Sequence, residues 1–105
     1  MAPIRGWPRA VMSQLTRDVR RIASRRSVTM FYIGRTVNLS ATASRHRCDD
    51  IIPIYETTSV NNVQAVEEYL INYFYEHPKN DNDAAHSGGG VTEGYWNYVY
   101  VAIWR

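Results

Sequence analysis

Apolar residues recur along the first part of this chain at helical spacing. Residues 8–25, PRAVMSQLTRDVRRIASR, carry apolar side chains on one side and arginines on the other. The apolar positions are Val11, Met12, Leu15, Val19, Ile22 and Ala23. Pro8 suits the first turn of a helix, where its missing N–H costs nothing. The pattern predicts an amphipathic helix that packs with one face and offers arginines from the other.

The pattern then changes to that of strands. Residues 27–34, SVTMFYIG, and residues 50–57, DIIPIYET, are rich in β-branched and aromatic residues. Pro53 indicates that the second strand lies at a sheet edge or carries a bulge. Between the two strands, Asn38 can cap a short helix over residues 39–46.

A second long helix, a loop and a last strand complete the chain. The segment NVQAVEEYLINYFYEH follows Asn61 or Asn62 as its cap, with an apolar stripe of Val63, Val66, Leu70, Tyr73 and Phe74. Residues 78–94 form a polar, glycine-rich stretch without periodicity. A loop of this length in so small a domain is typically functional or mobile. Residues 95–104 are apolar on both faces, which predicts a central strand.

This order of elements predicts a small α/β or α+β domain, with about three strands flanked by helices. A chain of 105 residues without repeat or linker suits one domain spanning residues 1–105. Its parts are an arginine-rich helix (8–25), a core (27–76), the glycine-rich loop (78–94) and the last strand (95–104).

Charge divides the chain into two halves. Residues 1–50 carry +7, all of the positive charge being arginine, and residues 51–105 carry −5. Arginine presents a planar fork suited to phosphate oxygens, so a basic half favours a polyanionic partner such as nucleic acid. The alternative is an ordinary solvated helix face. The arginines expected to contact nucleic acid are Arg17, Arg20, Arg21 and Arg47.

Cys48 is the only cysteine, which excludes an internal disulfide and a cysteine-based zinc site. The sequence has no apolar run long enough for a signal peptide or a membrane span. We therefore expect a soluble cytoplasmic protein.

The stretch FYIGRTVNLSATASRHR, together with the helix after residue 62, resembles the GIY-YIG endonuclease superfamily over about half of the chain, from Met30 to Asn82. Tyr32 and the following Ile-Gly are similar to the YIG half of the signature, and RTVNL is similar to the turn that follows it. His46 stands at the spacing of the family's histidine. In AVEEYLI, Glu67 stands at the family's single metal ligand.

The resemblance implies roles for these residues. Glu67 would hold Mg²⁺ or Mn²⁺, because Mg²⁺ keeps most of its water shell and needs few protein ligands. Tyr32 would orient the attacking water, and Gly34 would let the backbone approach a phosphate. Positive charge or a proton would come from Arg35, Arg45 and His46, with Asn80 or Asn82 in support. On position alone, a solvated helix edge is favoured for Glu67 and a helix C-terminal cation for His46.

Two features depart from the family pattern. The family's catalytic arginine position corresponds to Thr42, which shares a helix face with His46. Arg35, or less directly Arg45, would have to replace the missing guanidinium. The GIY strand is also absent before YIG. We hypothesise that the C-terminal strand replaces it, as in a circular permutation, with Tyr98 or Tyr100 supplying the first-motif hydroxyl.

Three functions remain open at this point. The first is a divalent-metal-dependent endonuclease, with DNA favoured over RNA as substrate. The second is a catalytically silent domain of the same type that binds nucleic acid or a protein partner. The third is a small interaction domain whose YIG resemblance is accidental. Oligomeric state is undetermined.

Overall fold

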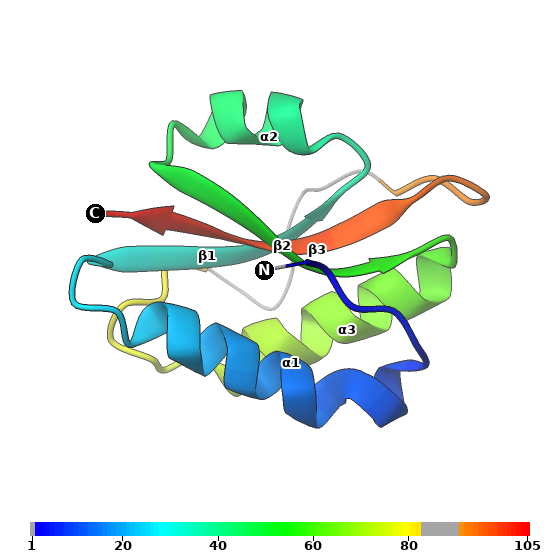
Figure 1. The fold of residues 1–105 in the computed structure, drawn as a ribbon, viewed down its shortest axis with the longest axis horizontal. Helices are drawn as coiled ribbons and strands as arrows, with labels where there is room; N and C mark the ends of the chain where they lie inside the picture. The colour runs from blue at the N-terminus through cyan, green and yellow to red at the C-terminus, as the bar shows by residue number, and fades with distance from the viewer. Residues whose placement is uncertain (1, 83–90) are drawn as a thin grey trace.

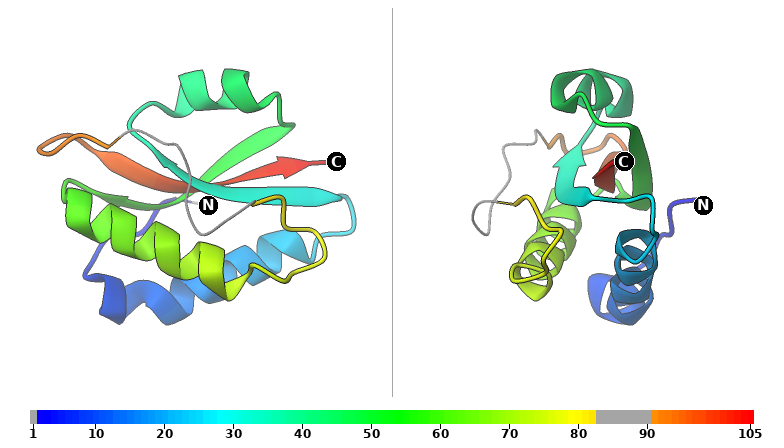
Figure 2. Two further views of the ribbon diagram at one scale, coloured as in Figure 1. Left: turned by 180° about the vertical axis from the view of Figure 1, so that it is seen from behind. Right: turned by 90° about the vertical axis from the view of Figure 1, so that its left-hand side faces the viewer.

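The protein forms three layers, with a three-stranded sheet between one helix above and two helices below (Figure 1). The computed structural model of the chain describes residues 2–82 and 91–105. The elements are α1 (Pro8–Ala23), β1 (Met30–Thr36), α2 (Leu39–His46), β2 (Asp50–Thr57), α3 (Val60–Tyr73) and β3 (Asn97–Trp104). Helices α1 and α3 cover one face of the sheet and the short α2 covers part of the other (Figure 2). This confirms the expected small α+β class.

The sheet is antiparallel, in the order β1-β3-β2, so the last strand of the chain is the central one. This confirms the expectation from its two-sided apolar pattern. Strand β2 lies at the edge, and its register with β3 shifts between Pro53 and Tyr55. The proline therefore lies in an edge strand, next to a break in the register.

Strand β3 pairs with β1 from Met30 opposite Trp104 to Thr36 opposite Tyr98. The permutation hypothesis required this pairing, which brings the C-terminal aromatic strand beside the YIG strand. Gly34 stands opposite Tyr100. The pairing agrees with the hypothesis, while the ancestry it implies stays a prediction.

The hydrophobic core lies between the sheet and the α1–α3 layer. Alternate residues of β1 point to opposite faces, as in any strand. Phe31 and Ile33 are fully buried in the core, where Phe31 packs edge-on against Phe74. Tyr32 and Thr36 contact α2 on the other face. A side chain's place in β1 therefore decides which layer it reaches.

Several element boundaries differ from those predicted. Helix α3 begins earlier, because the Ser59 hydroxyl, rather than Asn61 or Asn62, accepts the capping hydrogen bond from the Asn62 amide at 3.2 Å. The helix ends at Tyr73, whose ring is half exposed instead of lying in the apolar stripe. Strand β1 begins at Met30 and runs past Gly34 to Thr36.

The predicted loop over 78–94 is partly structured. Residues 79–82 run along the free edge of β1, where the Phe31 amide donates to the Lys79 carbonyl at 2.9 Å. The Asp81 amide donates back to the Phe31 carbonyl at 2.8 Å. Residues 83–90 of the predicted loop lie outside the described residues.

None of the helices in residues 2–82 and 91–105 has the length and apolarity needed to cross a bilayer.

Candidate active site

Two residues far apart in the sequence meet on the α2 face of the sheet. The His46 Nε2 atom, at the end of α2, lies 2.9 Å from the Tyr100 hydroxyl of β3. The Tyr32 ring packs against the imidazole, with ring centroids 4.7 Å apart, and lies 6.3 Å from the Tyr100 ring. The YIG tyrosine, the family-spaced histidine and a tyrosine from the C-terminal strand thus form one aromatic cluster.

Gly34 makes this cluster possible. A Cβ atom at position 34 would lie 2.6 Å from Tyr100 Cζ and 2.8 Å from Tyr32 Cε1, distances that real contacts do not show. The Tyr100 phenol therefore lies across the backbone of β1 at its only glycine. The glycine is buried beneath this ring, so its space admits the tyrosine rather than the phosphate expected from the sequence.

The environment of the cluster shifts the pKa values of His46 and Tyr100 and so fixes their protonation states. Burial lowers the pKa of His46, Arg45 lowers it further, and Asp81 opposes the effect. Burial also raises the pKa of Tyr100 well above its usual value; Tyr32 adds to this rise and Arg45 opposes it. At neutral pH the cluster is therefore a neutral imidazole beside a protonated phenol, and the imidazole can accept a proton.

The exposure of these side chains differs. Tyr100 is only 1% exposed, whereas Tyr32 and His46 are partly exposed and Arg45 is exposed. A ligand on this face would therefore meet Tyr32, His46 and Arg45, while Tyr100 orients the imidazole from beneath. Arg45 lowers the pKa of both His46 and Tyr100, so its charge acts on both side chains of the cluster.

Thr42 is tied into the structure at the position of the missing arginine. Its hydroxyl donates to the Thr36 Oγ1 atom at 2.8 Å, and its side chain is 1% exposed. A guanidinium could not be added here without opening the contact between α2 and β1. Thr42 is thus a packing residue between helix and strand.

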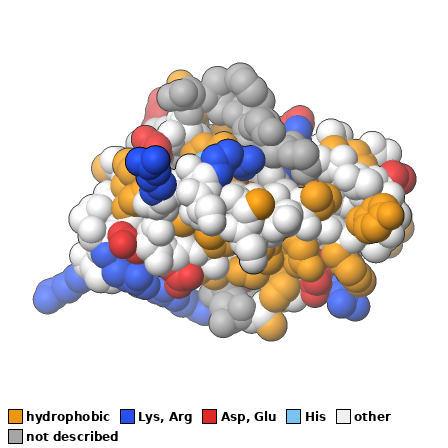
Figure 3. All heavy atoms as spheres, turned by 90° about the horizontal axis from the view of Figure 1, so that it is seen from above, with side chains coloured by type: hydrophobic (Ala, Val, Ile, Leu, Met, Phe, Trp, Pro, Cys, Tyr) orange, Lys and Arg blue, Asp and Glu red, His pale blue; other side chains and the backbone are white. Residues whose placement is uncertain are grey.

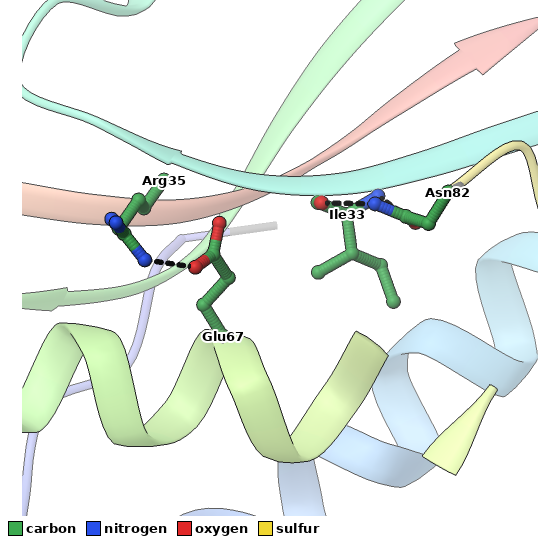
Figure 4. Close-up of polar contacts among 4 residues, drawn as sticks. All are labelled: Ile33, Arg35, Glu67 and Asn82. Carbon is green, nitrogen blue, oxygen red and sulfur yellow. Dashed lines mark hydrogen bonds and ion pairs between the residues drawn. The ribbon is translucent and has the colours of Figure 1, made fainter. Parts of the chain in front are cut away.

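Arg35 and Glu67 form an ion pair on the opposite face of β1 (Figure 4). The Arg35 Nη1 atom donates to the Glu67 Oε1 atom, beneath the sheet and above α3. Glu67 is fully buried, so the solvated helix edge favoured from its sequence position is wrong. The Arg35 Nε atom is buried without a hydrogen-bond partner among the described residues. The pair joins the strand to the helix through the protein interior.

Since Arg35 points to the α3 face, it does not join His46 as a second cation. The two clusters still influence each other, because the Glu67 carboxylate contributes to the raised pKa of Tyr100. The predicted catalytic residues therefore gather around residues 32–36 of β1, but on both of its faces.

The residues around Glu67 do not fit a ready divalent-metal site. A metal ion beside this carboxylate would have to compete with the Arg35 guanidinium, which already neutralises it. The described part of the chain contains no cluster of three or more histidine, cysteine, aspartate and glutamate side chains. Mg²⁺ or Mn²⁺ dependence therefore stays a prediction of the family resemblance.

Asn80 and Asn82 support the strand rather than the aromatic cluster. Asn82 is buried, accepts from the Ile33 amide at 3.0 Å and donates to the Ile33 carbonyl at 2.9 Å, as Figure 4 shows. Asn80 donates to the Phe74 carbonyl at 2.7 Å. Together they close the outer edge of β1 and connect it to the end of α3.

The predicted nucleic-acid arginines lie on two different layers. Arg17, Arg20 and Arg21 are exposed on α1, a helix that lies on the other side of the sheet from α2 (Figure 1). Arg47 is exposed at the end of α2, in the left-handed conformation with φ 53°. Seen from the α2 side (Figure 3), Lys and Arg side chains appear in several separate places with hydrophobic side chains between them.

The tyrosine that meets His46 is Tyr100, and Tyr98 lies elsewhere. Tyr98 lines a separate pocket of about 520 Å³ with Val37 and Trp96. Both tyrosines point to the same face of β3, so sequence alternation could not separate them. Only the register of β3 on β1 selects Tyr100, because it places this residue opposite Gly34.

Comparison with known proteins adds no relative: no family model, curated protein or solved structure matches this chain.

Proposed function

We propose that this protein is a phosphodiesterase of GIY-YIG type that cleaves nucleic acid, DNA in preference to RNA, at the face formed by Tyr32, Arg45 and His46. One observation carries the proposal: His46 and Tyr100, 54 positions apart, meet at 2.9 Å beside Tyr32. The resemblance names a YIG tyrosine, a histidine and a first-motif tyrosine. An accidental YIG sequence gives no reason for the other two to gather around it.

The chemistry follows from the state of each group. In hydrolysis a water oxygen bonds to phosphorus and its proton passes to a base. The departing oxygen keeps the electron pair of the broken bond and takes a proton from solvent. His46 is neutral and partly exposed, and with its Nε2–H donating to the Tyr100 oxygen its Nδ1 atom accepts the proton. Tyr32 orients the water, and the Arg45 guanidinium binds the charge that grows on the phosphate oxygens. Tyr100 is a positioning residue, because it holds the imidazole without reaching the surface.

A cleavage assay tests this proposal. Labelled duplex and single-stranded DNA and RNA are incubated with Mg²⁺, Mn²⁺ or EDTA. His46→Gln removes the base and is expected to abolish cleavage. Tyr100→Phe removes only the hydroxyl that orients His46, and is expected to lower kcat by about ten-fold or more with little change in KM.

Tyr98→Phe is the matched control, since it loses the same hydroxyl from the same face of β3, outside the cluster. Equal activity of Tyr98→Phe and Tyr100→Phe would contradict the proposed role of Tyr100. Undiminished cleavage by His46→Gln would exclude this face as the active site. The EDTA reactions decide whether the metal dependence implied by the resemblance holds.

A second function is favoured by a different observation. Thr42 is locked against Thr36, and the Glu67 carboxylate is neutralised by Arg35. Both family positions that would bind the transition state or the metal are thus occupied by internal contacts. This arrangement favours a catalytically silent domain that binds nucleic acid or a protein. Salt-sensitive binding of DNA without cleavage under any of these conditions would support this alternative.

A further inference from the structure

A groove on the far side of the molecule from His46 combines exposed tyrosines with arginines. It lies between α1 and α3, has a volume of about 400 Å³ and is lined by residues that include Met12, Arg17, Arg20, Tyr69 and Tyr73. Both helices belong to the layer beneath the sheet, opposite α2 (Figure 2). The groove is therefore separate from the candidate active site.

The two tyrosines present flat aromatic surface to solvent. Tyr69 is 46% exposed and Tyr73 is 50% exposed, one helical turn apart on α3. Their rings stack with centroids 6.0 Å apart and an angle of 23° between the planes. Large aromatic side chains kept this exposed carry a cost in water, and a nearly parallel pair is suited to planar ligands.

The arginines stand at the edge of this aromatic surface. The Arg20 Nη2 atom donates to the Tyr73 hydroxyl at 2.7 Å, and its guanidinium carbon lies 5.8 Å from the centre of that ring. Arg17 is held by Gln14, to whose side-chain oxygen it donates at 2.9 Å. Both guanidinium groups are exposed and are held in place by these hydrogen bonds. Little side-chain entropy is therefore lost when they bind an anion.

We propose that this groove binds single-stranded nucleic acid, with bases stacked on Tyr69 and Tyr73 and phosphates paired with Arg17 and Arg20. Aromatic platforms beside a basic groove are the general means of holding unpaired bases. A duplex would engage the arginines alone, since its bases are already stacked inside the helix. The inference deepens the proposed function by naming a strand class, and its test measures binding without cleavage.

The test measures fluorescence anisotropy of a fluorescein-labelled oligothymidylate and of a labelled DNA duplex at several salt concentrations. Tyr69→Ala is expected to weaken oligothymidylate binding by about 5- to 150-fold, the range for losing one stacked base. Tyr69→Phe keeps the ring and is expected to bind like the parent chain. Arg17→Ala is expected to lower the salt dependence by about one phosphate contact.

Tyr75→Ala is the matched control, because Tyr75 is 52% exposed and does not line the groove. Three results would overturn the inference. They are no binding of oligothymidylate, an equal loss in Tyr75→Ala, or unchanged binding in Tyr69→Ala.

The proposal for the groove and the proposal for the active site can be refuted independently. Loss of cleavage in His46→Gln with oligothymidylate binding retained supports both. If the parent chain binds through Tyr69 but does not cleave, the groove proposal stands and the proposed nuclease activity is wrong. If cleavage depends on His46 but Tyr69→Ala does not change binding, the proposed nuclease activity stands and the groove proposal is wrong.

Discussion

The surroundings of His46, a partly buried side chain, determine its protonation state. Burial and the neighbouring Arg45 both disfavour the imidazolium, so the pKa lies below the usual 6.5. The unfolded chain takes up this proton near pH 6.5, whereas the folded protein takes it up only at lower pH. The contribution of His46 to stability is therefore greatest above pH 6.5 and is lost as the pH falls through the lowered pKa.

The charge environment of His46 gives the first prediction. Arg45→Ala is expected to raise the pKa of His46 and Asp81→Asn to lower it, because the first removes a repelling charge and the second an attracting one. NMR titration of the imidazole measures both changes. Arg47→Ala is the control, since this neighbouring arginine is not among the causes of the shift; an equal rise in this variant would contradict the assignment.

Glu67 gives the second prediction. Glu67→Ala leaves the Arg35 guanidinium, whose side chain is 16% exposed, without its carboxylate, which is expected to cost up to about 3–5 kcal/mol of unfolding free energy. Urea unfolding measures this loss. Glu68→Ala, at the next and exposed position, is expected to stay within about 0.5 kcal/mol.

A double replacement separates an unpaired charge from a lost contact. Arg35→Met with Glu67→Leu removes both charges, so it is expected to be less destabilising than Glu67→Ala alone. If the double variant is less stable than Glu67→Ala, the ion pair stabilises the fold by more than the neutralisation of each charge by the other.

At the scale of elements, the outer edge of β1 depends on residues that sequence periodicity does not describe. An exposed strand edge presents unpaired N–H and C=O groups, which native proteins cover. Here residues 79–82 run along this edge, and the Asn82 side chain pairs with both backbone groups of Ile33. A segment predicted as loop therefore acts as a partial fourth strand.

The third prediction concerns this edge. Asn82→Ala leaves the buried amide and carbonyl of Ile33 without their partner, and is expected to destabilise the fold by about 2–3 kcal/mol. Hydrogen exchange of the Ile33 amide should accelerate in the same variant. Asn82→Asp keeps the acceptor for that amide and loses only the donor, so faster exchange in Asn82→Asp than in Asn82→Ala would contradict the account.

Element types were predictable because they depend on local spacing. The amphipathic α1, the Asn38 cap of α2 and the two-sided β3 all follow from neighbouring residues. Boundaries were less predictable where tertiary partners compete with local signals. Ser59 caps α3 ahead of two asparagines, and β1 continues past Gly34 because β3 pairs with it as far as Thr36.

At the scale of the whole molecule, the fold combines two oppositely charged halves of the sequence. Arg5 pairs with Glu56 at 3.2 Å and Arg35 pairs with Glu67, each joining the basic half to the acidic half. Exposed arginines lie on α1, at the end of α2 and also outside both helices, at positions 5, 25, 26 and 105. Exposed arginines therefore lie on both outer layers of the molecule, beside His46 on α2 and beside Tyr69 in the groove between α1 and α3.

The sequence by itself determined the class of the fold, the central place of the last strand and the candidate residues around YIG, because all three depend on local pattern or spacing. The tertiary structure alone decided which of these residues meet. The register of β3 selects Tyr100 over Tyr98, and strand alternation sends Tyr32 to one face and Arg35 to the other. Burial then decides their chemistry, pairing Glu67 with an internal cation and leaving His46 neutral. Such long-range contacts have no signature in any short stretch of chain, since they arise only when the strands align.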